Sequence, residues 1–255
     1  MVDLVDWVGR DMEDPHLRAI MGVCRSFRRF AIDLPSLWCE IKVNLTHNKG
    51  HAWLGLKLER SKSRALDLSI TAGDSTEPGS NWGLKKLEAI FPHSTRWRSL
   101  TLDASFDTLM ADFAAIEGKL PSLASLELFV GSSASLPIQA RHTLPQFFSK
   151  VPHLRTISIF AWVNLDCSAL PLHQLRHFSV EGMVCRPITG DPHSDSGPAH
   201  LATLLQPDSQ CQSLVVTPSE TYQWAHERTT APQLRHLEID DWFHNWMERF
   251  AGSSS

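Results

Sequence analysis

The sequence predicts an α/β solenoid with a parallel sheet, because one short phrase recurs along the chain. The phrase carries apolar residues at its first, fourth and sixth positions, most clearly in residues 154–159, 175–180 and 234–239. Looser copies start at Ala65, Trp97, Leu123 and Cys211. The last three positions alternate apolar, polar, apolar, which is the pattern of a strand with one buried face.

Two further observations favour a solenoid over the alternative, a doubly wound sheet. Roughly 20–35 residues separate most copies, enough for a crossover helix or an extended turn, so neighbouring strands should be parallel. A Pro-x-Leu opening precedes three copies, at Pro121, Pro152 and Pro232. A doubly wound sheet gives no reason for several strands to start alike.

The segment that precedes the repeats is predicted to be helical and then to turn. Asp14–Pro15 is a helix-start signal, and Leu34–Pro35 should end the helix because proline disfavours a helical residue before it. Residues 36–38 read as a short turn that anchors the Trp38 indole, and residues 40–43 alternate like a first strand. One helical stripe collects the apolar residues Val23, Cys24, Phe27, Phe30 and Ala31.

The later connections are also predicted from pattern. Helices are expected at residues 50–63, 84–91, 106–119, 199–206 and 220–228, with a short one at 147–148 and an apolar C-terminal helix at 242–250. Residues 72–82 and 186–198 are predicted to be loops. The C-terminal helix should cap the last repeat, because the open end of a solenoid must be covered.

Two parts of the sequence each resemble a known protein family. The recurring phrase resembles the strand segment of irregular leucine-rich repeats over about residues 65–241, which implies a right-handed solenoid with its sheet on the concave side. Residues 23–43 resemble the C-terminal half of an F-box, as found in large fungal families of F-box and leucine-rich-repeat proteins. The match is partial, since Val5–Asp6–Trp7 follows Leu4 where an F-box has its Leu-Pro-x-Glu helix.

The resemblance implies two domains and two binding surfaces. An F-box-like helical cap would occupy residues 1–43, and the solenoid with its C-terminal cap residues 44–255. The cap would bind a Skp-family adaptor through Val23, Cys24, Phe27, Phe30, Pro35, Leu37 and Trp38. The concave face would bind a partner through Asp103, Glu127, Phe129, Phe160, Glu181, Glu238 and Asp240.

The charge of the concave face indicates what kind of partner it fits. The outward strand positions in six of the copies include six acidic residues among twelve and no basic one. Asp103, Glu127, Glu181, Glu238 and Asp240 are expected to lie along one surface at equivalent outward positions. Like-signed charge on one face raises the local potential, so it would attract a basic segment of another protein. The alternative is that these residues are only the solvated side of the strands.

Composition excludes several classes of protein. The chain has 255 residues, 42% of them hydrophobic and 20% charged, which are the values of a globular domain. Residues 1–64 have a formal charge of +3 and the remainder −7, so an acidic body argues against a nucleic-acid binder. The first residues lack the basic and apolar run of a signal peptide, and no stretch has the length of a membrane span, which predicts an intracellular protein in cytoplasm or nucleus.

Neither an enzyme nor a metal protein is predicted. No nucleophile elbow, phosphate-binding loop, dinucleotide fingerprint or His-Glu-x-x-His motif occurs. The five scattered cysteines form no Cys-x-x-Cys pair, and they are expected to be buried thiols rather than metal ligands. We therefore expect a protein-recognition module without cofactor or metal, a substrate receptor of a cullin ubiquitin ligase that contacts adaptor, cullin and substrate. The alternative is a stand-alone leucine-rich scaffold that no longer binds the adaptor.

Overall fold

The computed structural model describes most of the chain. The described residues are 15–46, 50–72, 82–105, 113–131, 141–143, 146–161, 164–166, 170–182, 204, 209–218 and 233–239. The expected loop at 186–198 and the expected helices at 220–228 and 242–250 lie outside these residues, and so do Asp240 and, apart from Leu204, the expected helix at 199–206.

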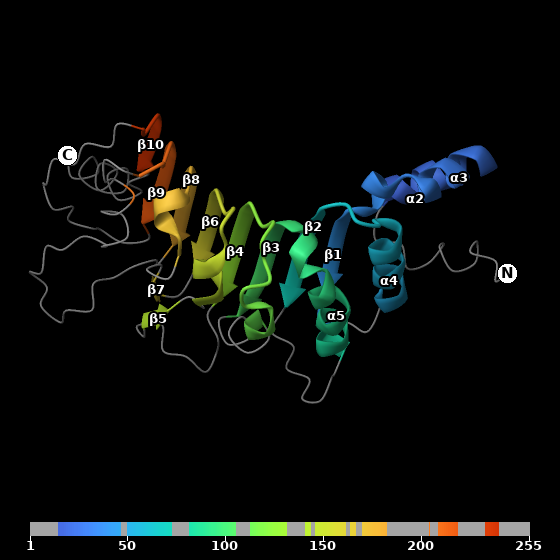
Figure 1. The fold of residues 1–255 in the computed structure, drawn as a ribbon, viewed down its shortest axis with the longest axis horizontal. Helices are drawn as coiled ribbons and strands as arrows, with labels where there is room; N and C mark the ends of the chain where they lie inside the picture. The colour runs from blue at the N-terminus through green and yellow to red at the C-terminus, as the bar shows by residue number, and fades with distance from the viewer. Residues whose placement is uncertain are drawn as a thin grey trace, which may run out of the picture.

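An eight-stranded parallel sheet runs through the molecule (Figure 1). Its strands are β1 (Glu40–Asn44), β2 (Leu66–Ala72), β3 (Trp97–Ser105), β4 (Ser125–Gly131), β6 (Thr156–Ala161), β8 (His177–Gly182), β9 (Ser213–Pro218) and β10 (His236–Ile239). Two short strands, β5 (Arg141–Thr143) and β7 (Asn164–Asp166), form a separate parallel pair. Every copy of the recurring phrase is a strand of the large sheet, which confirms the α/β class and the parallel pairing.

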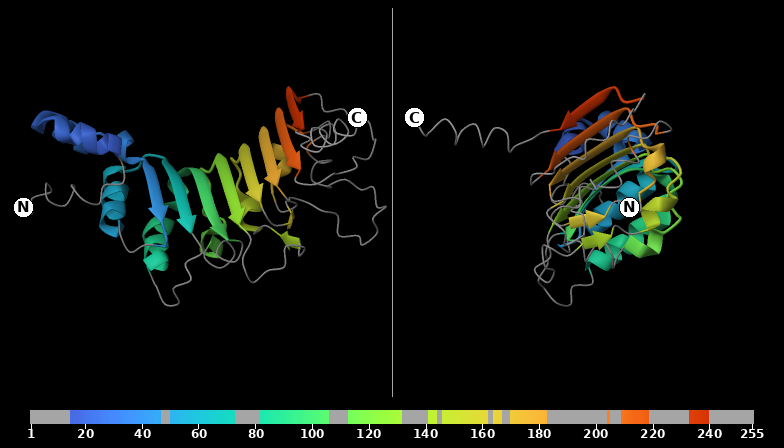
Figure 2. Two further views of the ribbon diagram at one scale, coloured as in Figure 1. Left: turned by 180° about the vertical axis from the view of Figure 1, so that it is seen from behind. Right: turned by 90° about the vertical axis from the view of Figure 1, so that its left-hand side faces the viewer.

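The strand order rules out the doubly wound alternative. The sheet follows the chain as β1-β2-β3-β4-β6-β8-β9-β10, without the reversal that defines a doubly wound sheet. Figure 2 shows the strands side by side in chain order. A monotonic order of this kind arises when each strand is laid beside the previous one, and it is compatible with a solenoid.

The register places the apolar positions of successive strands in straight rows. Leu126 of β4 lies beside Ile157 of β6, which lies beside Phe178 of β8. These three side chains are 0%, 0% and 1% exposed, as the phrase predicts for its fourth position. A row of identical spacing packs each apolar side chain against the same position on both neighbouring strands, and burial of each stabilises the fold by about 1.5–3 kcal/mol.

The described connections cover the same face of the sheet. They include α4 (His51–Arg60), α5 (Trp82–Ile90) and the 3₁₀ turns η2 (Phe91–Arg96), η3 (Ala114–Ile116), η4 (Gln146–Lys150) and η5 (Leu172–Gln174). Their apolar side chains join one core with the inward strand residues, and the right-hand view in Figure 2 places them on one side of the sheet. In its described part, residues 113–119, the helix expected at 106–119 contains only the 3₁₀ turn η3; Ile116 in this turn and Phe113 just before it are buried.

Two helices lie beyond β1 at the end of the sheet (Figure 1). They are α2 (Pro15–Val23) and α3 (Arg25–Asp33), followed by the 3₁₀ turn η1 (Pro35–Trp38). The prediction of one uninterrupted helix between Asp14–Pro15 and Leu34–Pro35 is wrong, because Cys24 is extended (φ −160°, ψ 173°) and separates α2 from α3. The stop at Leu34–Pro35 is confirmed.

A second, smaller core holds α2 and α3 together. It contains Leu17 and Met21 of α2, Ala31 of α3 and Trp38 of η1. The Trp38 side chain is 0% exposed and its Nε1–H donates a 2.7 Å hydrogen bond to the carbonyl oxygen of Ala31. The expectation that this turn anchors the indole is therefore confirmed. Among the described residues, no helix is long and apolar enough to cross a lipid bilayer.

Candidate functional site

The sheet has one face that the described connections leave uncovered. Inward residues of β2 and β4 are buried, whereas the alternate residues are half-buried at every position. We call this side the open face. In β3 to β10 the residues on this face include Ser99, Thr101, Asp103, Ser125, Glu127, Phe129, Thr156, Ser158, Phe160, His177, Ser179, Glu181, Ser213, Val215, His236 and Glu238.

An aromatic pair lies on the open face near the C-terminal ends of β4 and β6. Phe129 of β4 and Phe160 of β6 are adjacent in the register, with ring centroids 4.7 Å apart and planes only 5° from parallel. The same register row continues to Asp103 on one side and Glu181 on the other. Both carboxylates are exposed and both rings are half-buried. This row presents two aromatic surfaces between two negative charges, an arrangement that attracts cations.

The remaining predicted carboxylates belong to a neighbouring row. Glu127 lies beside Thr101, whose hydroxyl donates a 3.0 Å hydrogen bond to the Glu127 carboxylate. Glu238 lies beside Val215 in that same row. The expectation of equivalent outward positions is therefore wrong in detail: Asp103 and Glu181 occupy one row, and Glu127 and Glu238 the next. All four lie on the open face, because strand residues two apart point to the same side.

The open face also carries basic groups that the predicted set did not include. Lys42 of β1 forms an ion pair with Glu40 at 3.1 Å, and the His236 ring lies 3.3 Å from the Glu238 carboxylate. Asp67 of β2 accepts hydrogen bonds from the guanidinium of Arg98, one of them at 3.0 Å. The net negative charge of this face is therefore smaller than the strand pattern alone suggests.

The contacts of Asp67 change the pKa of its carboxyl group. Burial by itself raises the pKa of Asp67, but hydrogen bonds from Arg98 and from the Ser99 hydroxyl (2.8 Å), together with the Arg98 charge, lower the pKa below its ordinary value. The hydrogen bond with Asp67 and the negative charge of Asp67 raise the pKa of Arg98. Asp67 is thus a structural partner of Arg98 rather than a free contact for a ligand.

The F-box-like residues separate into an exposed and a buried group. Val23, Phe27 and Phe30 are 67%, 52% and 61% exposed, and Cys24 is exposed beside them. The apolar stripe of this segment is therefore turned to solvent, apart from Ala31. Cys24 also corrects the expectation of buried thiols, whereas Cys211 is buried and Cys39 half-buried.

The less exposed residues of this set hold the α2–α3 pair in place against the rest of the molecule. Pro35 and Leu37 are half-buried, and Trp38 is inaccessible. Trp38 packs on Trp53 of α4, with ring centroids 5.5 Å apart, so it connects the α2–α3 pair to the first helix of the sheet. Trp38 therefore positions the pair and offers no surface to a partner.

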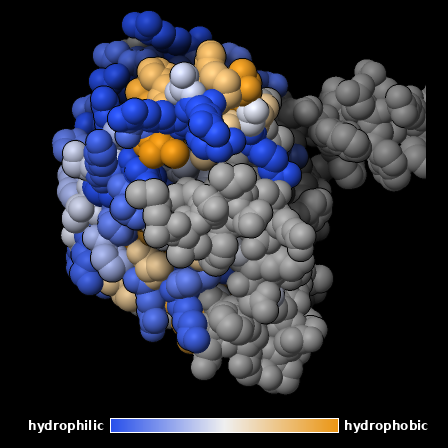
Figure 3. Space-filling model, turned by 90° about the vertical axis from the view of Figure 1, so that its right-hand side faces the viewer, coloured by the Kyte–Doolittle hydropathy of each residue, from blue (hydrophilic) through white to orange (hydrophobic). Residues whose placement is uncertain are grey.

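Basic side chains surround the exposed apolar residues of α2 and α3. Arg18, Arg25 and Arg29 are exposed, and Arg28 is half-buried with its Nε–H donating to the Met21 carbonyl at 3.2 Å. Figure 3 views the molecule from this end and shows apolar side chains among hydrophilic ones. We call Val23, Phe27 and Phe30 with these four arginines the hairpin patch.

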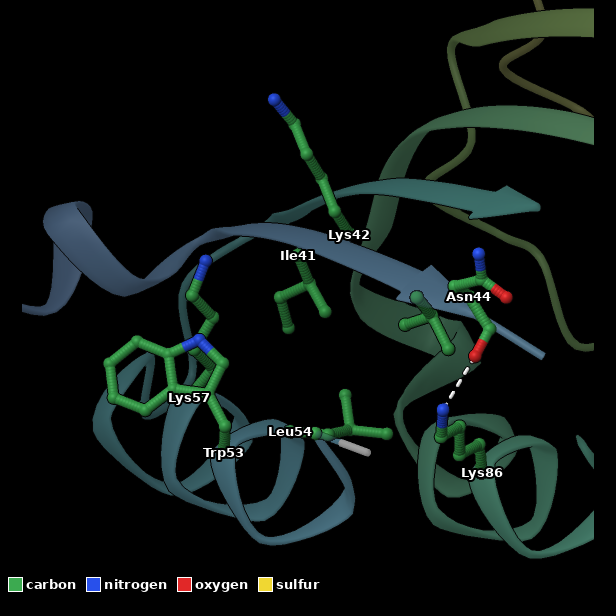
Figure 4. A pocket seen from close by; sticks show the side chains of 9 residues that line it. Ile41, Lys42, Asn44, Trp53, Leu54, Lys57 and Lys86 are labelled. Atoms are coloured by element: carbon green, nitrogen blue, oxygen red, sulfur yellow. Dashed lines mark hydrogen bonds between the residues drawn. The ribbon is translucent and has the colours of Figure 1, made fainter. Parts of the chain in front are cut away.

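Two lysines that the sequence pattern did not single out lie at the free edge of β1. Lys57 of α4 and Lys86 of α5 are 5% and 4% exposed. Their ammonium groups donate hydrogen bonds to the backbone carbonyls of Glu40 (2.7 Å) and Asn44 (2.5 Å), as Figure 4 shows for the second. These bonds occupy carbonyls that an edge strand would otherwise leave unpaired. Neither the helical spacing nor the charge pattern could reveal them, because the acceptors are backbone atoms.

The pocket beside these lysines is too small for a metabolite. It is lined by Ile41, Leu54 and Trp53 as well as both lysines (Figure 4). Its volume of about 10 Å³ is near the lower limit for one water molecule, whereas ligand pockets measure about 300–1,000 Å³. Trp53 Nε1 is buried here without a hydrogen-bond partner. Within the described residues, no three His, Cys, Asp or Glu side chains group as metal ligands.

Comparisons with known proteins found no match. No protein-family model matches the chain, and searches of curated proteins and of solved structures found no match. The two surfaces described above, the open face and the hairpin patch, are therefore interpreted from their own residues.

Proposed function

We propose that this chain is a non-catalytic protein-recognition module, an F-box-like cap followed by a leucine-rich-repeat solenoid. In this proposal it is a substrate receptor of a cullin ubiquitin ligase, in which α2 and α3 bind a Skp-family adaptor and the concave face binds the substrate. Catalysis would belong to partner enzymes, and this chain would supply proximity by holding both proteins at once.

The observation that carries the proposal is the exposure of Phe27 and Phe30. Large apolar side chains that are grouped and more than half exposed mark interaction sites, since a folded monomer gains nothing by presenting them to water. Aromatic and arginine side chains are also the residue types enriched at interfaces. The hairpin patch thus suits a partner with an apolar groove bordered by acidic residues.

The spacing of the two surfaces supports a receptor role. The hairpin patch lies beyond β1, whereas Asp103, Phe129, Phe160 and Glu181 lie in β3 to β8 (Figure 1). Two partners could therefore bind without competing for the same residues. The substrate would contribute a basic segment to the acidic residues of the open face.

Co-purification with a recombinant fungal Skp-family adaptor tests the proposal. The chain with Phe27→Ser and Phe30→Ser together should capture adaptor at least about tenfold less well, since interface aromatics that are buried on binding commonly contribute this much. Leu84→Ser on α5 is the matched control, because Leu84 is also half exposed (51%) but lies outside the patch.

The wild-type chain decides between the two candidate functions. Capture that is lost only in the double variant supports the receptor. An intact wild-type chain that captures no adaptor would contradict it and favour the stand-alone scaffold, which uses the open face alone. Circular dichroism on the same samples separates loss of binding from loss of fold.

A further inference from the structure

Two carboxylates of the open face differ from the others in having no partner. The open face carries six described carboxylates, and the four with a partner are Glu40 with Lys42, Asp67 with Arg98, Glu127 with Thr101 and Glu238 with His236. Within the part of the chain that the structure describes, the carboxylates of Asp103 and Glu181 form no ion pair and no hydrogen bond, and both side chains are exposed. A carboxylate already held by a neighbour has less attraction left for a ligand, so these two are the groups available to a cation.

The two unpaired carboxylates lie at the two ends of the aromatic pair, in the same register row. The row runs from Asp103 of β3 through Phe129 of β4 and Phe160 of β6 to Glu181 of β8. These four strands are consecutive in the sheet, so the row is about 14 Å long at about 4.8 Å per strand. Each carboxylate is therefore the direct neighbour of one ring.

The stacking of the rings determines which surface each of them presents. Their planes are 5° from parallel and their centroids 4.7 Å apart, a separation at which parallel rings overlap face to face rather than meet edge to edge. One face of each ring is therefore covered by the other ring. Because the two residues are in register on adjacent strands, the second face of Phe129 is turned toward β3, and that of Phe160 toward β8.

Each end of the aromatic pair thus combines a ring face with a carboxylate. We call these two combinations, Phe129 with Asp103 and Phe160 with Glu181, the end sites. The face of a phenyl ring carries partial negative charge and attracts a cation placed over it, and the neighbouring carboxylate attracts the same cation. Among the described residues, no lysine or arginine lies over either ring. The end sites are therefore open to a cation from a partner.

The chemistry of an end site favours arginine over lysine. A guanidinium is planar and weakly hydrated, so it can stack on the ring face while its N–H groups donate hydrogen bonds to the carboxylate. A lysine ammonium is a compact, strongly hydrated charge that must lose more of its water to contact the ring. Both side chains satisfy the carboxylate, but only arginine also matches the flat aromatic surface.

The distance between the end sites sets the spacing of two bound arginines. Guanidinium groups in contact with the outer ring faces, about 3.5–4 Å from them, would be about 11–12 Å apart. In an extended segment, residues four apart point to the same side and lie about 13 Å apart. The flexible arginine stems can absorb this small difference. Adjacent arginines point to opposite sides of an extended segment, so only one of them could reach an end site.

The row beside the end sites favours an extended segment over a helix. It contains the hydroxyl groups of Ser158 and Ser179, which are neighbours in the register and can both donate and accept hydrogen bonds. An extended segment has backbone N–H and C=O groups that need such partners, whereas a helix pairs these groups internally. A helix would also need arginines two turns apart to span the same distance.

We propose that the open face binds an extended segment of a partner protein with two arginines four residues apart. One arginine occupies each end site, and the residue midway between them rests on the edges of the Phe129 and Phe160 rings. The inference rests on the proposed function, in which this face receives a basic segment of the substrate, and it names the residue type, spacing and conformation of that segment.

Four synthetic peptides test the inference on the whole chain. The first contains Arg-Ser-Ala-Ser-Arg between short Gly-Ser ends, and the second has the same composition with the arginines adjacent. The third has lysine in place of both arginines, and the fourth is an alanine-rich helix with two arginines seven residues apart. Titrations followed by saturation-transfer difference NMR, which suits weak ligands, should show the first peptide binding at least about threefold more tightly than each of the others.

Each peptide comparison can contradict a different part of the inference. Equal binding of the adjacent-arginine peptide would overturn the spacing, and equal binding of the lysine peptide would overturn the stacking of a guanidinium. Equal binding of the helical peptide would overturn the extended conformation. Binding by none of the peptides would overturn the inference as a whole. Adaptor capture through the hairpin patch is measured separately, so capture without peptide binding would remove this inference and leave the proposed function in place.

Two double variants separate the ring faces from the carboxylates. Phe129→Leu with Phe160→Leu keeps apolar side chains but removes the ring faces, and it should abolish the preference for the arginine peptide over the lysine peptide. Asp103→Asn with Glu181→Gln removes both carboxylate charges and should weaken binding of the first peptide about tenfold.

A matched control tests whether the position of the lost charges matters. Glu127→Gln with Glu238→Gln also removes two negative charges from the open face, but from the neighbouring row. This variant should bind the first peptide within about threefold of wild type, because its end sites are intact. Equal weakening by the two charge-removing variants, with circular dichroism showing both folded, would mean that only the overall charge attracts the peptide and would overturn the inference.

Discussion

The apolar residues of the sheet and those of the α2–α3 pair differ in their exposure to solvent. In the sheet, the inward residues Leu126, Ile157 and Phe178 are at most 1% exposed. In α3, Phe27 and Phe30 are more than half exposed, and only Ala31 is buried. Both regions carry a regular apolar pattern, but one pattern is covered by the chain itself and the other is not.

The difference shows what an apolar pattern can establish. A strand in a parallel sheet has neighbours on both sides, and its crossover must return over the same face, so its inward residues are covered by construction. A short helix at the end of the molecule has a covered face only where another element packs on it. In α3 only Ala31 packs on Leu17 and Met21 of α2 in the small core. Phe27 and Phe30, which follow the break at Cys24, lie outside this core and are exposed.

Truncation in the sheet should have the largest effect on stability. Leu126→Ala, Ile157→Ala and Phe178→Ala should each lower the free energy of unfolding by about 2–5 kcal/mol through loss of burial and formation of a cavity. Ser158→Ala, on the open face beside Ile157, is the matched control and should change stability by less than about 0.5 kcal/mol. Urea denaturation measures both, and an unchanged midpoint in all three truncations would contradict the register.

Removal of a lysine at the β1 edge should have an intermediate effect. Lys57→Met and Lys86→Met keep the aliphatic stem but leave the carbonyl of Glu40 or Asn44 without this donor, which costs about 1–3 kcal/mol for a buried group. The exposed Lys62, which follows α4, provides a control, Lys62→Met. Thermal denaturation that cannot distinguish the Lys57 and Lys86 variants from the Lys62 variant would show that the two lysine hydrogen bonds contribute no stability.

The Asp67–Arg98 contact should contribute a smaller, pH-dependent amount. The pKa of Asp67 is lowered in the folded state, so its contribution is complete above the unfolded pKa of about 3.9 and is lost as pH falls through the folded value. The difference in urea midpoint between wild type and Asp67→Asn should therefore shrink from pH 5 to pH 3. A difference that stays constant over this range would indicate that the contact does not depend on the charge of Asp67.

Changes in the hairpin patch should have the smallest effect on stability. Phe27→Ser and Phe30→Ser should each alter the free energy of unfolding by no more than about 0.5 kcal/mol, since both side chains are already largely in water. Trp38→Phe, which removes the hydrogen bond to the Ala31 carbonyl, should cost more, about 1–3 kcal/mol. Equal destabilisation by all three would mean that the patch is covered within the folded chain.

The strands and their buried rows could be predicted from the sequence. The recurring phrase has a period of two within each copy, and the copies such as residues 154–159 and 175–180 align without gaps, so strand, face and partner follow from spacing alone. The open-face residues Phe129 and Phe160 were placed on the correct side for the same reason. The Trp38 turn followed from proline chemistry at Leu34–Pro35.

The parts that required the tertiary structure involve contacts between distant segments. Lys57 and Lys86 bind backbone carbonyls of β1, and Arg98 binds Asp67 from 31 residues away. None of these contacts leaves a periodic signal.

The sequence by itself determined which residues the sheet buries, because a period of two and a repeated unit leave each strand only one apolar face. Only the tertiary structure decided that the apolar stripe of α3 faces water and that Arg98 pairs with the negative charge of Asp67. It also decided that Asp103 and Glu181 lie on either side of a stacked Phe129–Phe160 pair. Exposure and charge depend on what packs against a residue from elsewhere in the chain, and local pattern carries no information about that neighbour.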